Sequence, residues 1–254
     1  MLERDFSHVS NFTGYMQTVL RLASNGNSHH RILDIPAGNG LLAERLRNDG
    51  HEVVCADINR ARPDYVYANL GEALPFRDAE FDACLCLEGI EHVLDSISLV
   101  RELCRITKPG GRIIISLPNI QNMFSRFQFL CTGYFYQFAP WTSRHLVPGE
   151  LIDRGHISSL SYLQLRYMFH DSGARLIQLA GDRWKKKWLI PFVLPFVGLG
   201  FIWSRATLKR HTEAPVQECR TMLKDLFSKP LLFSRSLILI FEKQASSPDA
   251  TAST

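Results

Sequence analysis

The run Glu-Gly-Ile-Glu-His at positions 88–92 brings two carboxylates and an imidazole close together in the sequence. If these residues form a turn of helix, Glu88, Glu91 and His92 project to the same side. Two carboxylates and an imidazole suit a divalent metal ion, which would hold a vicinal diol or a catechol and lower the pKa of its hydroxyl group. The imidazole alone suits a general base, because its reference pKa is about 6.5. The run therefore predicts metal or acid–base chemistry on a hydroxyl acceptor.

A glycine-rich turn, Asp34-Ile35-Pro36-Ala37-Gly38-Asn39-Gly40, provides a second candidate site. Its glycines allow a ligand to approach the backbone closely, and the helix expected after it offers unpaired N–H groups. Asp57 ends the next apolar run, where a carboxylate can accept two hydrogen bonds from a ribose diol. Ala68-Asn69-Leu70 follows the third run, where an adenine edge would meet the Asn69 side chain or a backbone amide. These positions predict a site for a nucleoside-containing ligand.

Two ligands compete for this turn. Gly38-x-Gly40-x-x-Ala43 fits the dinucleotide fingerprint, and Asp57 lies near the spacing expected of its ribose-binding acid. Asp34 argues against a dinucleotide, since a carboxylate beside the turn repels a pyrophosphate but attracts a cationic amino acid. The α-ammonium group and the sulfonium centre of S-adenosylmethionine supply such a positive charge. The turn favours that ligand, and an NAD-dependent oxidoreductase stays as an alternative.

Apolar runs that alternate with amphipathic stretches must position these groups. Strands are expected at 31–35, 52–57, 64–68, 81–87, 112–117, 174–180 and 236–242. Helices are expected between them at 40–49, 96–107 and 160–171, and Lys108-Pro109-Gly110-Gly111 is expected to end the second of these. Such alternation predicts βαβ units and a parallel sheet with helices on both faces. Ligands bind at the carboxyl ends of the strands in such sheets, so we expect the candidate residues to gather at one edge.

The length and composition suit one large α/β domain. The chain has 254 residues, of which 46% are hydrophobic and 21% charged, and its net charge of +4 does not by itself indicate nucleic acid. None of the six cysteines forms a CxxC pair, which favours free thiols in a reducing compartment. No secretory signal is expected at the N-terminus, so we expect a cytoplasmic protein, and residues 244–254 are expected to be disordered.

Five motifs resemble those of class I S-adenosylmethionine-dependent methyltransferases and occur in the same order. They are Ile32–Gly40, Ala56-Asp57, Leu74-Pro75-Phe76, Glu80–Ala83 and Lys108–Gly111. The resemblance implies a Rossmann-like α/β fold with a seven-stranded, mostly parallel sheet, helices on both faces and an antiparallel final strand. It also implies Asp34 near the methionine end of the cofactor, Asp57 on the ribose and Asn69-Leu70 near the adenine. Other positions expected beside the cofactor are Pro36, Gly38, Gly40 and Glu88, although many family members have Gly in place of Pro36 and often Asp in place of Asn69.

The run at 88–92 is similar to the ExxEH element of ubiquinone-biosynthesis O-methyltransferases and of small-RNA terminal 2′-O-methyltransferases. In those families a downstream histidine completes a metal site. The resemblance implies a divalent metal such as Mg, held here by Glu88, Glu91, His92 and His156, with His145 as a second candidate for the downstream ligand. The RNA-type element has a further histidine, and Val93 replaces it in this chain. Metal-free methyltransferases also carry Glu-His here, so catalysis by His92, Glu91 and His156 without a metal is the alternative.

The segment 184–230 is longer than a usual connection between paired strands and is interpreted as an insertion. Trp188–Trp203 carries no charge over 16 residues, which is short for a spanning helix, and Pro191 and Pro195 are expected to break it. Basic residues and tryptophans flank this stretch, so we expect contact with an anionic membrane surface through 184–210. A cap over the acceptor pocket and a dimer contact are the alternatives. The aromatic segment 121–145 is expected to be a lid or a second part of the same surface.

The sequence therefore predicts a methyltransferase that uses S-adenosylmethionine, acts on the oxygen of a lipid-like, quinone-like or lipid-linked sugar acceptor, and is peripheral on a membrane. The likeness extends to methyltransferases that act on cell-surface glycans or lipids. The expected organisation is a helical segment at 1–30, a core at 31–183, the insertion at 184–230 and a last core strand at 231–243. A non-catalytic scaffold at a membrane is the alternative from another class. Nucleic acid is disfavoured because the basic residues cluster beside apolar ones, and the oligomeric state stays open.

Overall fold

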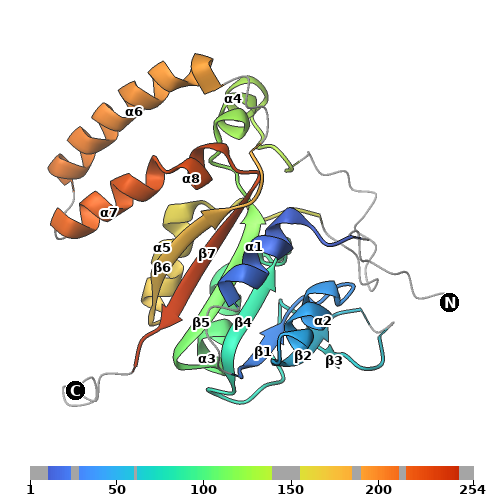
Figure 1. Cartoon of the computed structure of the whole chain (residues 1–254). Helices are drawn as coiled ribbons and strands as arrows, with labels where there is room; N and C mark the ends of the chain where they lie inside the picture. The colour runs from blue at the N-terminus through green and yellow to red at the C-terminus, as the bar shows by residue number, and fades with distance from the viewer. Residues whose placement is uncertain are drawn as a thin grey trace, which may run out of the picture.

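A seven-stranded sheet forms the centre of the computed structural model, which describes residues 11–23, 29–59, 62–138, 155–184, 190–211 and 216–245. The strand order is β3-β2-β1-β4-β5-β7-β6, with β7 antiparallel to both of its neighbours and the other pairs parallel (Figure 1). The strands are β1 (Arg31–Asp34), β2 (Glu52–Asp57), β3 (Val66–Tyr67), β4 (Phe81–Leu87), β5 (Thr107–Pro118), β6 (Ala174–Gly181) and β7 (Ser236–Lys243). This arrangement confirms the predicted Rossmann-like sheet and its antiparallel final strand.

Helices cover both faces of the sheet, because alternate residues of each strand pack on opposite sides. Leu33 of β1 belongs to a core with α3 (Ser96–Ile106) and α5 (Tyr162–Asp171), whereas its neighbour Ile32 packs with α1 (Gly14–Ala23) and α2 (Leu41–Asn48). Figure 1 shows α1 crossing the front of the sheet, with α3 and α5 behind the strands. The remaining helical elements are η1 (Ile90–His92), α4 (Met123–Thr132), α6 (Ile190–His211), α7 (Val216–Leu226) and α8 (Lys229–Phe233).

Two strand boundaries differ from those expected. The Lys108–Gly111 run does more than end the preceding helix, since it lies within β5, which starts at Thr107 opposite Phe81. The register between β4 and β5 shifts after Phe81, and a Cβ atom at Gly111 would lie 2.9 Å from the carbonyl oxygen of Asp82. Glycine therefore lets the two backbones approach at this irregularity. The third strand is shorter than expected, with two residues at the sheet edge.

The insertion leaves and rejoins the sheet at the edge where the parallel strands end. Gly181, the last residue of β6, pairs with Leu237, and Pro118, the last residue of β5, pairs with Ser236. Residues between these strands fold into α6, α7 and α8. The prediction that the two prolines break the apolar stretch is wrong, because α6 continues for 22 residues with Pro195 inside it. Pro191 lies in the first turn, where backbone N–H groups have no helical partner, and Pro195 removes a single backbone hydrogen bond in the second turn.

The structure agrees with some of the expectations for the cysteines and the chain ends, but not with all of them. Cys55, Cys84, Cys86 and Cys104 are buried and free, as expected, but Cys131 on α4 is exposed. The N-terminal segment contains α1. Of the expected tail at 244–254, residues 246–254 lie outside the described part of the chain.

Candidate functional site

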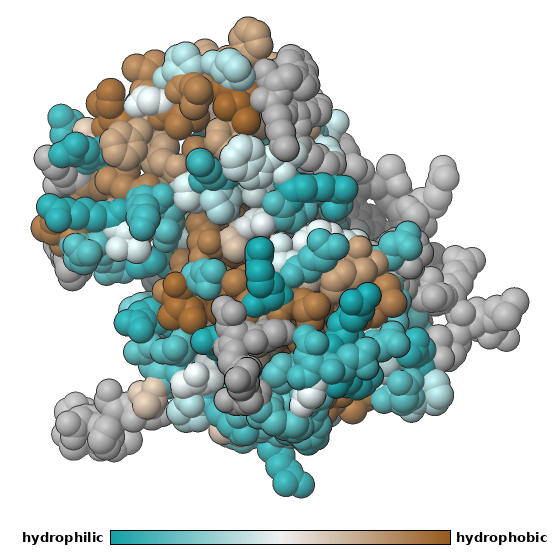
Figure 2. All heavy atoms as spheres, in the orientation of Figure 1, coloured by the Kyte–Doolittle hydropathy of each residue, from teal (hydrophilic) through white to brown (hydrophobic). Residues whose placement is uncertain are grey.

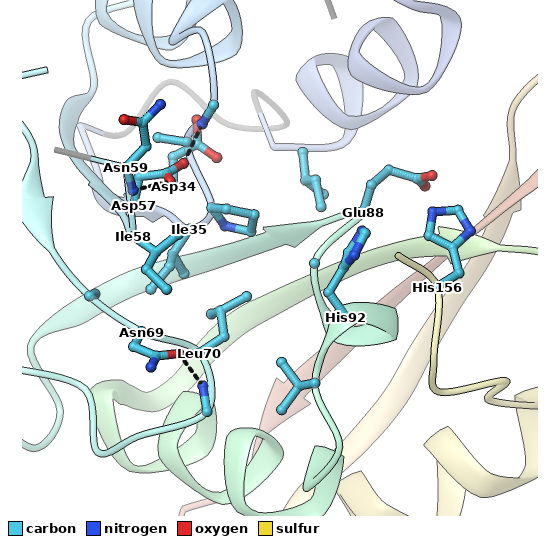
Figure 3. Close-up of a pocket in the computed structure, with 18 of the residues that line it drawn as sticks. Asp34, Ile35, Asp57, Ile58, Asn59, Asn69, Leu70, Glu88, His92 and His156 are labelled. Atoms are coloured by element: carbon cyan, nitrogen blue, oxygen red, sulfur yellow. Dashed lines mark hydrogen bonds between the residues drawn. The ribbon is translucent and has the colours of Figure 1, made fainter. Parts of the chain in front are cut away.

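A cavity of about 830 Å³ opens at the carboxyl ends of β1, β2 and β4 (Figure 3). Six segments line it: 13–16 at α1, 34–42 in the glycine-rich turn, 57–59 after β2, 68–72 after β3, 87–95 after β4, and 155–156, together with Arg235. Both candidate sites predicted from the sequence therefore face one continuous space. The topology explains this arrangement, since β1, β2 and β4 are parallel neighbours whose carboxyl ends share an edge.

The glycine-rich turn is held by the carboxylate that ends β2. Asp57 Oδ2 accepts a hydrogen bond of 2.9 Å from the backbone N–H of Gly38, and its Oδ1 accepts one of 2.8 Å from the N–H of Asn59. Gly40 adopts φ 76°, and a Cβ atom there would collide with the hydroxyl group of Tyr65. A glycine is therefore required at the start of α2, and Asp57 keeps oxygen lone pairs for a ribose diol at the rim of the cavity.

Asp34 lies at the bottom of the turn and is 3% exposed. Burial, aided by the nearby Asp57 carboxylate and opposed by Arg47, raises the pKa of its carboxyl group to about 7. A buried acid with this pKa gains its charge most readily when a cationic ligand group arrives. A buried acid here suits an ammonium or sulfonium group better than a pyrophosphate, and the role predicted for Asp34 stays a prediction.

Asn69 and Leu70 line the cavity beside Ala68, but the Asn69 side chain is engaged within its own loop. Its Oδ1 accepts a hydrogen bond of 3.0 Å from the N–H of Gly71, and its Nδ2 donates one of 2.7 Å to Glu72. Of the two adenine contacts considered for this loop, the structure favours the backbone of residues 68–70 over the Asn69 amide.

Pro36 joins the two halves of the cavity. A Cβ atom at Gly89 would lie 2.6 Å from Pro36 Cδ and 3.1 Å from Leu70 Cδ1, so the turn after β1 packs directly on the run that follows β4. Glycine at position 89 permits this contact. The glycine within the Glu-Gly-Ile-Glu-His run therefore has a packing role that links donor-side and acceptor-side residues.

Glu88 separates from the other two residues of the acceptor-side run. Only residues 90–92 form η1, and Glu88 precedes it with φ 49°. Its Oε1 accepts a hydrogen bond of 2.9 Å from the Ser116 hydroxyl, and burial raises the pKa of its carboxyl group. Glu88 lines the cavity between its two halves. Among the described residues, the group close enough to share a metal ion contains Glu91, His92 and His156 but not Glu88, so the prediction of Glu88 as a metal ligand is not supported.

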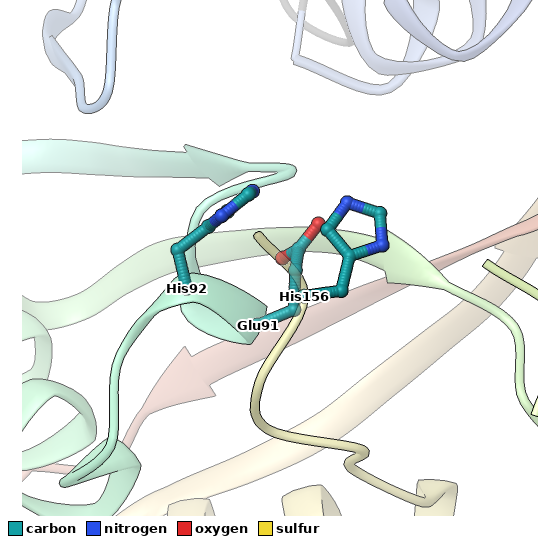
Figure 4. A group of neighbouring side chains, drawn as sticks. All are labelled: Glu91, His92 and His156. Carbon is teal, nitrogen blue, oxygen red and sulfur yellow. The ribbon is translucent and has the colours of Figure 1, made fainter. Parts of the chain in front are cut away.

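Glu91, His92 and His156 form a cluster, in which one ligand atom from each residue lies within 4.8 Å of the others (Figure 4). The backbone brings them together, since the Glu91 carbonyl oxygen accepts hydrogen bonds of 2.9 Å from the N–H groups of Ile157 and Ser158. The imidazole centroids are 5.0 Å apart in an edge-to-face arrangement. His156 Nδ1 lies 2.8 Å from the carbonyl oxygen of Gln137, so it carries the proton and Nε2 is the basic nitrogen.

Glu91 is the unusual member of this cluster. Its side chain is fully buried, and neither carboxylate oxygen has a hydrogen-bond partner within the described structure. Burial, followed by repulsion from Glu88, raises the pKa of Glu91 well above its usual value. A buried carboxyl group with no hydrogen-bond partner is costly, and a metal ion would satisfy both of its oxygens. The second histidine candidate, His145, lies outside the described residues.

Among the cavity residues that were not predicted are Tyr15, Met16 and Arg235. Tyr15 and Met16 on α1 close the cavity over the glycine-rich turn, and Arg235 enters from the base of the insertion. Burial, with a smaller effect of Glu88, raises the pKa of Tyr15 to about 12, so its hydroxyl stays neutral. Arg235 donates a hydrogen bond of 3.0 Å from Nε to Gln137 Oε1. No local motif marks these residues, because their positions depend on how α1 packs against the sheet and on where β7 pairs within it.

A second cavity of about 330 Å³ adjoins the cluster and shares His156 with the first. Its walls are mostly aromatic and come from the segment predicted to be a lid: Phe129, Tyr134, Phe135 and Phe138. Phe127 and Leu130 on the same segment are exposed, at 63% and 81%. The segment thus contributes both to a pocket wall and to the surface, and its residues beyond 138 lie outside the described structure.

Comparison with known proteins agrees with this geometry. A family model described as a methyltransferase domain matches residues 8–179. A ubiquinone biosynthesis O-methyltransferase of Alkalilimnicola ehrlichii is 33% identical over 129 residues, covering 45% of this chain and 52% of the relative. A demethylmenaquinone methyltransferase of Beutenbergia cavernae is 35% identical over 96 residues, covering 34% and 40%. The chain thus spans about half the length of the curated relatives it matches.

Solved structures share the fold at low sequence identity. A SAM-dependent methyltransferase from Archaeoglobus fulgidus superposes with a TM-score of 0.56 at 15% identity, over 90% of this chain and 93% of that one. A Burkholderia thailandensis 1,6-didemethyltoxoflavin-N1-methyltransferase, solved with S-adenosylhomocysteine, gives 0.51 at 12% identity, over 91% and 77%. From the family match, the sheet order and the acidic residues that end β1 and β2, the chain belongs to the methyltransferase domain family and has the fold of class I S-adenosylmethionine-dependent methyltransferases.

Proposed function

We propose that the chain transfers the methyl group of S-adenosylmethionine to a hydroxyl oxygen of a largely apolar acceptor, of the lipid-like, quinone-like or lipid-linked sugar class. The observation that carries this proposal is the single cavity of about 830 Å³, in which Asp34 and Asp57 line one end and His92 and His156 the other. Such a cavity holds a donor and an acceptor side by side. Methyl transfer then depends mainly on alignment and exclusion of water, because the sulfonium centre is already activated.

At the donor end, each contact follows from the geometry of the turn. Asp34 binds the ammonium group of the methionine part, Asp57 accepts hydrogen bonds from the ribose, and the backbone of residues 68–70 meets the adenine. Tyr15 and Met16 cover the bound donor from α1. Glu88 lies beside the reacting groups, where it faces the methyl donor and the acceptor.

At the acceptor end, His92 serves as the general base and His156 positions the acceptor hydroxyl. The hydroxyl oxygen forms a bond to the methyl carbon, while the bond between that carbon and sulfur breaks and leaves its electron pair on sulfur. The hydroxyl proton passes to the imidazole of His92, which leaves S-adenosylhomocysteine and a methyl ether as products.

The acceptor class rests on the apolar character of the adjoining cavity. The aromatic walls around His156 suit a planar ring or an apolar tail, with the hydroxyl group directed towards the histidines. Relatives named as ubiquinone and menaquinone methyltransferases support a quinone-like ring as the first acceptor to test.

A second arrangement of the same site is a divalent cation bound by Glu91, His92 and His156. The two unpaired oxygens of buried Glu91 support it, and so does the 4.8 Å grouping of the three ligand atoms. Two imidazoles and one carboxylate suit Mn²⁺ or Zn²⁺ better than Mg²⁺, which prefers oxygen ligands. A bound cation would lower the pKa of an acceptor hydroxyl.

Calorimetric titration of the purified protein tests the donor half of the proposal. We expect S-adenosylmethionine and S-adenosylhomocysteine to bind and NAD not to bind. A second assay tests the acceptor class. It compares the rate of methyl transfer from labelled S-adenosylmethionine to soluble catechols or quinols with the rate to sugar acceptors. An absence of S-adenosylmethionine binding with Asp34 and Asp57 intact would overturn the proposal.

Calorimetric titration with Mn²⁺ and Zn²⁺ tests the cation arrangement. Glu91→Gln is expected to abolish binding, whereas Glu88→Gln is expected to retain it, because Glu88 is engaged with Ser116. Equal binding by both variants and by the unaltered protein would exclude the three-residue site. Full activity after treatment with a chelator would favour His92 as an unaided base.

A further inference from the structure

The helix α6 is apolar on all sides from Ile190 to Trp203 and has little of its surface covered. Its first 19 residues, Ile190–Leu208, are long and apolar enough to cross a membrane, and none of the most apolar window is buried. Its partner is α7, which it meets where the rings of Phe201 and Phe227 lie 5.2 Å apart. An exposed apolar helix of this size needs another apolar phase or another protein surface to cover it.

Four strongly exposed apolar side chains of α6 form one stripe, and the equally exposed Ile202 lies beside it. Phe192, Phe196, Leu199 and Trp203 are 67–77% exposed and follow one another at intervals of four, three and four residues. Such spacing places them on the same side of a helix. The half-buried residues Val193, Val197, Gly200 and Ser204 occupy another side. Figure 2 shows apolar side chains gathered over this helix, at the upper left of the molecule.

The charged side chains in the sequence interval that contains α6 are all positive. No Asp or Glu occurs from position 183 to 212, whereas Arg and Lys occur seven times in that interval: Arg183, Lys185, Lys186, Lys187, Arg205, Lys209 and Arg210. A purely apolar partner surface of a second protein copy would gain nothing from these cations. Anionic lipid headgroups complement them, at about 1 kcal/mol for each cation near the surface.

The sheet decides how α6 meets a membrane. The strands that flank the insertion are hydrogen-bonded neighbours, with Gly181 opposite Leu237, so both ends of the insertion are on the same side of any bilayer. If α6 crossed the bilayer, a second crossing would be needed to return to β7. The return segment contains α7, an 11-residue helix with four charged residues, and α8, which has five residues. Neither supplies the roughly 20 apolar residues that a crossing needs.

We infer that α6 lies parallel to an anionic phospholipid bilayer and buries its apolar stripe in one leaflet, as a monotopic anchor. At about 1.5 Å per residue its 22 residues extend about 33 Å along the surface. The anchor rises from the edge of the sheet where the cavity opens, since β5 ends opposite the first residue of β7. Arg235, at the base of the insertion, lines that cavity. An acceptor embedded in the leaflet therefore reaches His92 and His156 without leaving the membrane for bulk water.

Only the route of the acceptor in this inference rests on the proposed function. Vesicle binding is therefore measured without an acceptor and without methyl transfer. Full-length protein is mixed with vesicles of phosphatidylcholine alone or with phosphatidylglycerol, and its co-sedimentation is measured. We expect stronger binding to the anionic vesicles and weaker binding at high salt. Failure to bind either vesicle would overturn the inference, while S-adenosylhomocysteine binding would still report on the proposed function.

A matched pair of variants locates the contact. The double variant Phe196→Asp/Trp203→Asp is expected to lower the vesicle partition coefficient at least tenfold. Tyr167→Asp, at a residue 71% exposed on α5, is expected to leave it unchanged. Both variants should bind S-adenosylhomocysteine like the unaltered protein, because neither site lines the cavity. Undiminished vesicle binding by the double variant would refute the inference, and so would a dimer that the double variant dissociates without any effect of vesicles.

Discussion

The carboxylate of Asp57 accepts a hydrogen bond from the backbone N–H of Gly38, with 2.9 Å between Oδ2 and the amide nitrogen. The contact joins the end of β2 to the glycine-rich turn after β1, and the same carboxylate also holds the N–H of Asn59. The turn is therefore arranged before the donor binds. A single side chain both shapes the loop and presents oxygen atoms to the ribose.

Replacing this carboxylate should weaken donor binding without unfolding the domain. Asp57→Ala is expected to raise the dissociation constant of S-adenosylhomocysteine roughly 10- to 100-fold, since it removes charge-assisted hydrogen bonds of about 1.5–3 kcal/mol. Calorimetry measures the change. Asp64→Ala provides the control, because Asp64 is exposed and pairs only loosely with Arg62. Equal affinities for the two variants would contradict the role of Asp57.

Donor binding should strengthen as the pH rises through the pKa of Asp34, which is about 7. The cationic ligand attracts the ionised carboxylate, so the affinity for S-adenosylmethionine is expected to increase several-fold between pH 6 and pH 8. Asp34→Asn should bind more weakly and lose this part of the pH dependence. Titrations across the pH range decide the matter, and an unchanged pH profile in the variant would exclude Asp34 as the titrating group.

The same residue predicts an opposite trend for the stability of the ligand-free protein. The pKa of Asp34 is higher in the folded chain than its reference value of 3.8, so folding favours the protonated form. The contribution of protonated Asp34 to the free energy of unfolding is fully present below the pKa that Asp34 has in the unfolded chain. This contribution is lost as the pH rises towards and through about 7. Asp34→Asn should therefore be the more stable protein at pH 8. Thermal unfolding at pH 5 and pH 8 measures the difference, which should shrink at the lower pH.

His92 should matter for turnover and not for donor affinity. His92→Ala is expected to lower kcat by roughly 10²- to 10⁴-fold, the usual contribution of a general base, and to leave S-adenosylhomocysteine binding unchanged. His156→Ala should raise the acceptor KM as well. His170→Ala, on the exposed side of α5, is the control. Unchanged biological activity of the His92 variant would instead favour the non-catalytic scaffold.

Gly89→Ala should distort the contact between the two halves of the site. The added methyl group would lie 2.6 Å from Pro36 Cδ, and the proline ring cannot rotate away. We expect a loss of about 1–3 kcal/mol in the free energy of unfolding and weaker donor binding. Gly14→Ala is the matched substitution, since nothing lies within 4 Å of its Cβ position. Chemical denaturation compares the two, and equal stabilities would show that Pro36 yields to the methyl group.

Much of the core could be predicted because its signals are local. The expected strand 52–57 matches β2, and the expected strand 81–87 matches β4, since a run of apolar residues bounded by turn residues carries its own signature. Asp34 and Asp57 follow such runs, so the sequence predicted their shared edge. The seven-stranded sheet with its antiparallel final strand was predicted from the family resemblance. The comparisons confirmed that resemblance.

The remaining features depend on contacts between distant parts of the chain. Glu88 was grouped with Glu91 and His92 by spacing, but its backbone precedes η1 and its side chain turns to Ser116 on β5. Tyr15 reaches the cavity only because α1 packs across the sheet. Pro195 was expected to break α6, yet it removes only one backbone hydrogen bond from a long helix. Local propensity does not predict the places of Glu88 and Tyr15, because tertiary packing determines them.

The pairing of β6 with β7 makes the insertion a separable module. Asn119 donates hydrogen bonds from Nδ2 to the carbonyl oxygens of Pro230, Leu231 and Ser234, so α8 belongs to the catalytic domain and the module comprises α6 and α7. Because both of its ends return to adjacent strands, evolution can lengthen, exchange or delete it without shifting the register of any strand. The residues proposed to bind the methyl donor and the helix proposed to meet a membrane therefore lie in separate parts of the fold, so that one can change without moving the other.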